Sequence, residues 1–197
     1  MILNYYDSES KENCIGIDNE KASFEVVNYL MLVGHRNIGC ITGKLNTQTG
    51  KQRLDGFKRA IKINNIKIDK ELIVTGDWTK ESGSLAMKRL LSLNKNNPPT
   101  AVFVAGDEMA LGAMEVVKEM GLRIPGDISF IGFDNIPQSG VKDVSLATVE
   151  QPFSDLATLG IKHLIEIIKE KTKQPVKILL DNTKFIKRAS VKALVSN

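Results

Sequence analysis

The chain has 197 residues, of which 42% are hydrophobic and 25% charged, and its formal net charge is +4. This composition indicates a folded protein of one large or two small domains, and the charge is too small for an arm dedicated to nucleic-acid binding. No apolar run of about 18 residues predicts a membrane span, and the first residues, MILNYYDSES, lack the regions of a secretion signal, so we expect a cytoplasmic protein.

Apolar runs separated by capping and turn residues predict alternating strands and helices. After the pentad IGIDN (15–19), we expect a helix over 20–33, a strand over 37–43, a helix over 50–64, a strand over 72–76, a helix over 80–94, a strand over 100–106, a helix over 107–120 and a strand over 128–133. The expected helix caps are Asp18 with Asn19, Thr79 and Asp107. A short strand near 146–149, a helix over 154–170 and strands over 176–180 and 185–188 complete the order.

The short, continuously apolar strands that alternate with helices indicate a parallel sheet with helices on both faces. The predicted fold class is therefore α/β, with three layers in the order α/β/α. Ligands of such sheets bind beyond the carboxyl ends of the strands. The pentad IGFDN (131–135) ends there, and so its Asp134 and Asn135 have two interpretations. They stop a strand and cap a helix, or they face a ligand, and their position favours the ligand.

Arg53 has an unusual position on the helix expected over 50–64. At 100° per residue it falls within the apolar arc formed by Leu54, Phe57 and neighbouring residues, whereas the lysines fall opposite. A cation cannot face the sheet without a large desolvation cost. We therefore expect Arg53 to lean over the strand ends toward an acid or a polar ligand, with Asp134 as the candidate partner.

The helix expected over 107–120 is apolar over more of its circumference than one sheet face requires. This surplus indicates a second buried surface, which another subdomain or another copy of the chain would supply. Deep burial within one fold is the alternative explanation.

Groups with catalytic or metal-binding chemistry are scarce. Cys14 and Cys40 lie in apolar runs, which favours two free buried thiols over a disulfide. His35 and His163 fall on predicted helix ends or faces, and no metal-ligand spacing, phosphate-binding loop or nucleophile elbow is present. We expect no catalytic residue, no metal and no cofactor.

Several longer stretches carry a family resemblance. They are DN (18–19), GHRNIGCITG (34–43), RLDGFKRA (53–60), AVFVAGDEMALGAMEVVKEMGLRIPGDISFIGFDN (101–135), LATVEQP (146–152) and FIKRAS (185–190). Together they resemble the lactose-repressor/galactose-repressor (LacI) family of bacterial transcriptional regulators. Members of that family carry a DNA-binding helix-turn-helix headpiece, followed by a dimeric effector-binding core of two subdomains with a periplasmic-binding-protein-like fold of type I.

The resemblance implies a division of the chain. Residues 1–17 correspond to the end of the first subdomain and a crossing strand, and residues 18–150 to the complete second, effector-binding subdomain. Residues 151–183 return to the first subdomain, and residues 184–197 form the last segment of the second. The headpiece and most of the first subdomain have no counterpart, so we expect an N-terminally truncated chain: a complete second subdomain with remnants of the first.

Site residues follow from the same resemblance. The family residues that match Arg53 and Asp134 hydrogen-bond sugar hydroxyls, and an aromatic side chain at the position of Trp78 stacks on a sugar face. Other matches to pocket positions are Thr49, Gln151, Phe153 and, on the side of the first subdomain, Asn4. The chain departs from the family at Gly106, where a polar residue is usual, so one contact to the ligand is expected to be lost.

The resemblance also implies partners. Family dimers use the helix over 107–120, which places Ala110, Leu111 and Met114 at the interface. The expected effector is a sugar or a nucleoside-like molecule, and operator DNA is expected to be contacted only through the missing headpiece. No membrane partner is expected.

Three functions remain open from the sequence. The first is the effector-binding and dimerisation part of a transcriptional regulator, which the resemblance favours as a repressor. The second is a solute-binding protein of a sugar transporter, against which the absent signal peptide and the RIPGDIS motif count. The third is a small α/β enzyme, against which the lack of a nucleophile–base pair counts.

Overall fold

The computed structural model of the protein describes residues 1–7, 9, 11–169 and 175–194. The chain forms two compact units: unit 1 comprises Met1–Asp18 and Gln151–Lys184, and unit 2 comprises Asn19–Glu150 and Phe185–Asn197. The correspondence of these units to a first and a second subdomain stays a prediction. Residue 170, the end of one expected helix, and residues 195–197 of the expected last segment lie outside the described residues.

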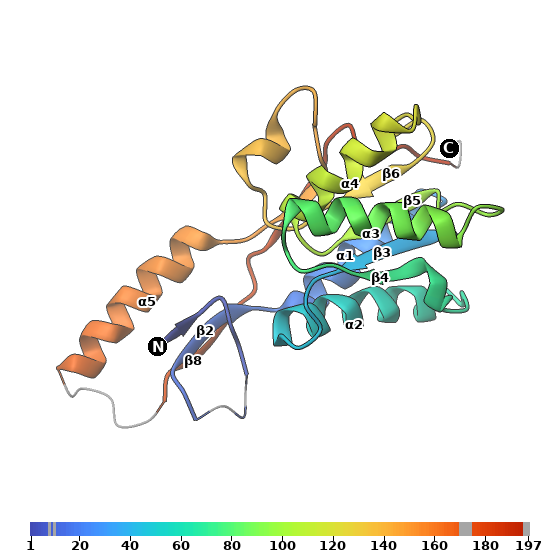
Figure 1. The fold of residues 1–197 in the computed structure, drawn as a ribbon. Coiled ribbons are helices and arrows are strands. Elements are labelled where there is room, and N and C mark those ends of the chain that lie inside the picture. The colour runs from blue at the N-terminus through green and yellow to red at the C-terminus, as the bar shows by residue number, and fades with distance from the viewer. Residues whose placement is uncertain (8, 10, 170–174, 195–197) are drawn as a thin grey trace. The chain divides into compact units, whose positions relative to one another are not determined.

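The helices and strands follow one another nearly as expected (Figure 1). They are β1 (Ile2–Leu3), β2 (Cys14–Ile17), α1 (Asn19–Leu32), β3 (Ile38–Thr42), α2 (Gln48–Ile63), β4 (Ile73–Thr75), α3 (Lys80–Leu93), β5 (Ala101–Val104), α4 (Asp107–Glu119), β6 (Ser129–Ile131), β7 (Thr148–Glu150), α5 (Phe153–Ile168), β8 (Lys177–Leu180) and β9 (Lys184–Ile186). Two short 3-10 helices cover Lys70–Leu72 and Pro137–Gly140. Strand β1 was not expected.

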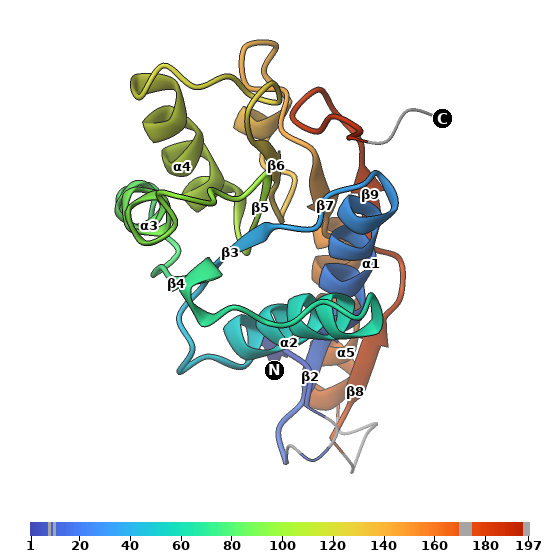
Figure 2. The ribbon, with the colours of Figure 1, turned by 90° about the vertical axis from the view of Figure 1, so that its right-hand side faces the viewer.

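Unit 2 contains the predicted parallel sheet, with strand order β4-β3-β5-β6. Helices α1 and α2 pack together on one face and α3 and α4 on the other, as Figure 2 shows, which confirms the three-layer α/β class. Ile41 of β3 is aligned with Val74 on one side and Val104 on the other, so the strands end at the same edge. This edge is where sequence reasoning placed the ligand.

The core of unit 2 lies between the sheet and its two helical layers. On the α3–α4 side, Met87, Leu90, Val102 and Val117 are fully buried. On the other side, Phe57 of α2 stacks on Phe103 of β5, with ring centroids 6.5 Å apart. Cys40 lies in this core and Cys14 in unit 1, both buried and free, as predicted.

The broad apolar surface of α4 is accounted for inside unit 2. Ala110 and Met114 are 0% and 3% exposed, because α3 covers the side of α4 that the sheet leaves open. The second surface inferred from the sequence is thus α3 of the same unit, and the simpler explanation, deep burial, is correct. Of the three predicted interface residues, Leu111 is the one with a partly exposed side chain.

Two expected helix caps have different outcomes. Thr79 caps α3 as predicted, since its side chain accepts a hydrogen bond from the backbone N–H of Ser82. The cap of α4 was assigned wrongly: Gly106 is the N-cap residue, without a side-chain bond, and Asp107 is already the first helical residue. The carboxylate of Asp107 instead accepts hydrogen bonds from Thr148 and Ile136.

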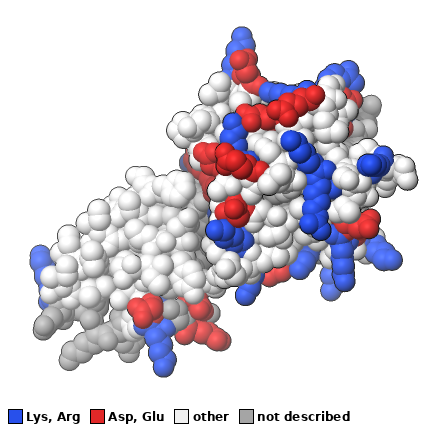
Figure 3. All heavy atoms as spheres, viewed as in Figure 1, with Lys and Arg blue, Asp and Glu red and all other residues white. Residues whose placement is uncertain are grey.

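Unit 1 is a three-stranded parallel sheet, in the order β1-β2-β8, on which α5 packs. The side of α5 away from this sheet is apolar and exposed through Ile161, Leu164, Ile165 and Ile168. Figure 3 shows the corresponding surface as a broad area with few charged side chains. In the part of the chain that the structure describes, no helix is long and apolar enough to cross a membrane.

The close contact of α3 with α4 yields a stability prediction. In an exposed helix, replacing glycine by alanine stabilises by about 1 kcal/mol. Gly83 of α3 is buried, and a Cβ there would overlap the carbonyl oxygen of Met109. We expect Gly83→Ala to lower the free energy of unfolding by about 1–3 kcal/mol, because α3 must move away from α4.

Urea denaturation followed by circular dichroism measures this change. Ser92→Ala, on the exposed side of the same helix, is the control and should change the midpoint little. A midpoint for Gly83→Ala equal to or above that of the unchanged chain would show that the two helices are not in the close contact described.

Candidate functional site

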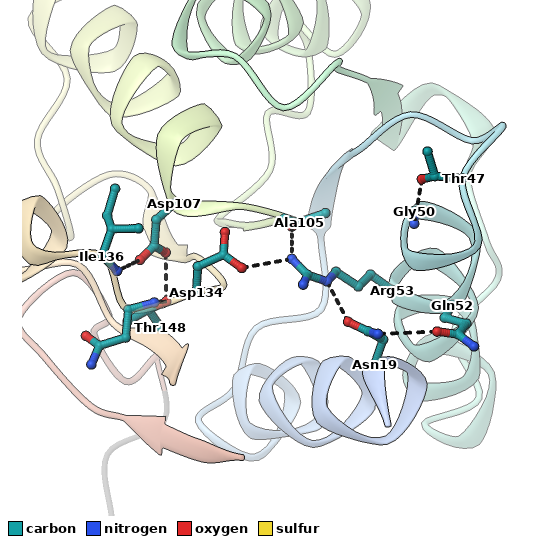
Figure 4. Close-up of polar contacts among 11 residues, drawn as sticks. Asn19, Thr47, Gly50, Gln52, Arg53, Ala105, Asp107, Asp134, Ile136 and Thr148 are labelled. Carbon is teal, nitrogen blue, oxygen red and sulfur yellow. Dashed lines mark hydrogen bonds and ion pairs between the residues drawn. The ribbon is translucent and has the colours of Figure 1, made fainter. Parts of the chain in front are cut away.

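Arg53 is the centre of a polar network at the carboxyl edge of the sheet in unit 2 (Figure 4). It is 2% exposed. Its Nε donates to Asn19 Oδ1 at 2.9 Å, and its Nη1 donates to the carbonyl oxygen of Ala105 at 2.6 Å and to Asp134 Oδ1 at 3.2 Å. The expectation that the side chain of Arg53 extends over the strand ends to Asp134 is confirmed.

The guanidinium of Arg53 also lies near two aromatic rings. Its Cζ lies 3.6 Å from the ring centroid of Phe133 and 5.7 Å from that of Trp78. Burial lowers the pKa of Arg53 from its usual value, and the nearby carboxylate of Asp134 opposes that change. None of the hydrogen bonds among the described residues uses Nη2 of Arg53.

Trp78 lies over the ends of β3 and β5. A Cβ at Gly43, just after β3, would overlap the indole ring, so the ring needs glycine at that position. A Cβ at Gly106, just after β5, would lie 3.6 Å from both Trp78 Cε3 and Asp134 Oδ2. A side chain at Gly106 would therefore lie between the indole and the carboxylate. The loss of a ligand contact at this position stays a prediction.

Asp134 follows β6, and its backbone is held by the adjacent segment at Val149 and Glu150. Its backbone N–H donates to the carbonyl oxygen of Val149 at 2.8 Å, and the residue pairs with Glu150 in a parallel bridge. The side chain is 26% exposed, so the carboxylate is accessible while it contacts Arg53. Asp134 has a φ of 124° and Trp78 one of 81°, both in the region that favours glycine.

Asp107 connects the start of α4 to the loop after Asp134. Its carboxylate accepts hydrogen bonds from Thr148 Oγ1 at 2.7 Å and from the backbone N–H of Ile136 at 3.1 Å. The side chain is fully buried. Burial raises the pKa of Asp107 to about 6, although the hydrogen bond from Thr148 opposes the change.

The structure brings three of the predicted ligand residues together: Arg53, Asp134 and Trp78. Thr49 lies one turn before Arg53 on α2 and is partly exposed. The remaining three, Asn4, Gln151 and Phe153, belong to unit 1 and stay predictions. Phe153 is the first residue of α5 and is 50% exposed, whereas Gln151 is 4% exposed.

Sequence reasoning missed several members of the network. Asn19 was predicted to cap a helix, but its side chain accepts from Arg53 and donates to Gln52 Oε1 at 3.3 Å. Phe133 and the carbonyl group of Ala105 were not recognised either. The signal for Asn19 was its place after a strand, beside a buried arginine that needs an acceptor.

Other candidate groups lie away from this network. His35 is buried, with Nδ1 2.9 Å from Thr100 Oγ1 and Nε2 3.1 Å from the carbonyl oxygen of Lys192, and burial lowers its pKa. His163 pairs with Glu166 on α5. Among the described residues, no group of three or more histidines, cysteines and acids could hold a metal ion.

The raised pKa of Asp107 predicts a pH dependence of stability. An acid whose pKa is higher in the folded protein than in the unfolded chain makes folding less favourable as pH rises between the two values. For Asp107 this interval runs from 3.8 to about 6. The loss amounts to roughly 3 kcal/mol, by the usual conversion of pKa differences to free energy.

The variant Asp107→Asn has no ionisation at this position and is expected to lack this loss. Urea denaturation at intervals between pH 4 and pH 7 should show the free energy of unfolding of the unchanged chain falling relative to that of the variant. If the two profiles remain parallel across this range, Asp107 does not titrate as the buried geometry implies.

Comparisons with known proteins identify the family of the chain. The family model of the periplasmic binding protein-like domain matches residues 27–191. The probable HTH-type transcriptional repressor ExuR of Bacillus subtilis (strain 168) is 40% identical over 96% of the chain, and the HTH-type transcriptional repressor CytR of Escherichia coli (strain K12) is 38% identical over 98%. The chain spans 56% of the length of each of these two relatives.

Solved structures give the same result. A transcriptional regulator CelR–cellobiose complex has a TM-score of 0.88 and 30% identity to the chain, covering 93% of it and 55% of that structure's own chain. A sugar-binding transcriptional regulator of the LacI family from Escherichia coli has a TM-score of 0.85 and the same identity, covering 98% of the chain and 68% of its own. The chain belongs to the periplasmic binding protein-like domain family, in the form found in LacI-type transcriptional regulators.

Proposed function

We propose that the chain is the effector-binding and dimerisation part of a bacterial transcriptional repressor. The observation that carries this proposal is the buried guanidinium of Arg53, which offers Nη2 beside the accessible carboxylate of Asp134 and the indole ring of Trp78. A donor, an acceptor and an aromatic face suit a small ring-shaped molecule with hydroxyl groups, such as a sugar or a nucleoside. Thr49 is proposed to add a further contact, while Asn4, Gln151 and Phe153 stay expectations from the family resemblance.

The relatives favour a regulator over the two other functions. ExuR and CytR are named as transcriptional repressors, and neither is named as part of a transporter. The CelR structure contains cellobiose, which supports a sugar as the class of effector for a chain of this fold. We propose that the site binds its ligand without chemical change, since the network contains an ion pair and amides and has no nucleophile beside a base. Operator recognition is proposed to need a DNA-binding headpiece in addition to this chain.

The proposed site predicts a fluorescence response. Trp78 is the single tryptophan of the chain, so its emission reports on the site directly. We expect a member of a panel of hexoses, pentoses, disaccharides including cellobiose, and nucleosides to change that emission. Arg53→Ala and Asp134→Asn should each weaken the response at least tenfold, because each removes a charge-assisted hydrogen bond of roughly 1.5–3 kcal/mol.

Arg59→Ala is the matched control for this titration. Arg59 lies on the same helix and forms an exposed ion pair with Glu20, so its loss should leave the titration unchanged. A ligand that changes Trp78 emission equally in the unchanged chain and in both site variants would show that it binds elsewhere.

The proposed dimer predicts an effect of charge at Leu111. The side chain of Leu111 is partly exposed, whereas Ala110 and Met114 are buried, so Leu111 is the position that tests the interface without disturbing the core. We expect Leu111→Lys to shift the sedimentation coefficient toward that of a monomer, because a buried unpaired charge destabilises an interface.

Leu85→Lys, at a residue of α3 that is 69% exposed, is the control for added charge and should leave the mass unchanged. All proteins are compared with the unchanged chain, since the exposed apolar side of α5 is expected to promote association by itself. An unchanged mass for Leu111→Lys would exclude α4 from the interface.

A further inference from the structure

Asn135, the neighbour of Asp134, is held between two charged side chains. Its Nδ2 donates to Glu150 Oε2 at 2.7 Å, and its Oδ1 accepts from Nη2 of Arg188 at 2.7 Å. Its backbone N–H donates to Thr148 Oγ1 at 3.3 Å. Both ends of the amide thus have charged partners, and such hydrogen bonds are shorter and stronger than neutral ones.

The backbone at this point requires support. Asp134 has a φ of 124° and Asn135 a φ of 55°, so two successive residues with side chains adopt conformations that favour glycine. Asparagine tolerates the left-handed region better than most residues, but Asp134 has no such advantage at its own φ. Strained conformations of this kind persist where the surrounding contacts hold them. The Asn135 amide supplies two of these contacts.

Arg188 extends the support across the loop that follows. Its Nη1 donates to the carbonyl oxygen of Leu146 at 2.7 Å and to Ser139 Oγ at 3.2 Å, while Nη2 bonds Asn135. One guanidinium therefore connects the start of the loop at Asn135 to its middle and its end. The side chain of Asn135 cannot turn away while these bonds are present.

The partners of Asn135 also lie where the chain passes between the two units. Glu150 is the last residue of unit 2 before the chain enters unit 1 at Gln151. Arg188 follows the return of the chain to unit 2 at Phe185. Asn135 is therefore hydrogen-bonded to one side chain just before the chain leaves unit 2 and to another soon after it returns.

We propose that Asn135 and Arg188 are positioning residues that set the carboxylate of Asp134 opposite Arg53 and connect it to the returning chain. The importance of this role for effector binding depends on the proposed function, but the arrangement itself does not. The competing explanation is that Asn135 is present because asparagine accepts a positive φ. The variant Asn135→Gly distinguishes the two explanations, because glycine accepts the positive φ but removes the amide side chain and its hydrogen bonds.

The experiment uses the ligand-free chain and two-dimensional NMR. The Nε–H of Arg53 bonds Asn19, and its signal reports on the guanidinium whose Nη1 bonds Asp134. The indole N–H signal of Trp78 reports on the ring near that guanidinium. We expect Asn135→Gly and Arg188→Ala to move both signals in the direction in which Asp134→Asn moves them. Unchanged signals in Asn135→Gly would overturn the proposal and leave the φ explanation.

Two matched variants control for the substitutions themselves. Asn65→Gly makes the same change at a φ of 57°, at an exposed position after α2. Arg123→Ala removes an exposed arginine that pairs with Asp127. Neither should move the Arg53 or Trp78 signals. Equal movement in these controls would mean that the signals respond to general loosening, which also overturns the proposal.

The connection to the returning chain has its own test. In the unchanged background, Asp134→Asn should move the backbone amide signals of Lys187 and Arg188. In the Asn135→Gly background the same substitution should no longer move them, because the bond from Arg188 is gone. Movement that persists in that background would show that Asp134 is coupled to this segment by another route. A failure of every sugar or nucleoside to bind would count against the proposed function and leave these measurements unaffected.

Discussion

The buried ion pair of Arg53 with Asp134 is the constraint on which the site depends. A guanidinium that is 2% exposed loses nearly all of its hydration, and one carboxylate at 3.2 Å does not replace it. The remaining compensation comes from Asn19, the carbonyl group of Ala105 and the ring of Phe133. These groups come from α1 and from the residues that follow β5 and β6, so keeping one charge buried requires three separate segments to meet α2 at the same edge of the sheet.

That edge also concentrates the backbone strain of unit 2. Trp78, Asp134 and Asn135 all have positive φ and all follow strand ends of the same sheet. Each is held by contacts that a different sequence would lack: Gly43 leaves space for the indole, and Asn135 is bonded on both sides. Strain held in this way is typical of sites that must be preformed before a ligand arrives. The fully buried Asp107 serves the same purpose by connecting α4 to the loop after Asp134.

The sequence was sufficient for the order of elements in unit 2 because its strands and helices are short, regular and strongly patterned. It was also sufficient for Arg53, since a cation within an apolar arc has few alternatives to a partner at the strand ends. The sequence led to wrong predictions where a residue type can either cap a helix or bond a distant segment. Asn19 and Asp107 are both good cap residues by type, yet each uses its side chain for a bond to a distant segment. The apolar excess of α4 was likewise ambiguous, because periodicity measures how much surface is buried and not which neighbour buries it.

The sequence by itself determined the α/β class, the parallel sheet, the edge at which ligands are expected and the pairing of Arg53 with Asp134. Hydrophobic periodicity and the cost of an unpaired buried charge are local properties, so they can be read along the chain. Only the tertiary structure decided that α3 covers α4, that Trp78 lies over Gly43, and that Asn135 bonds Glu150 and Arg188. These are contacts between residues up to 53 positions apart. Residue type and spacing do not specify them, because they depend on how the segments pack once the sheet has formed.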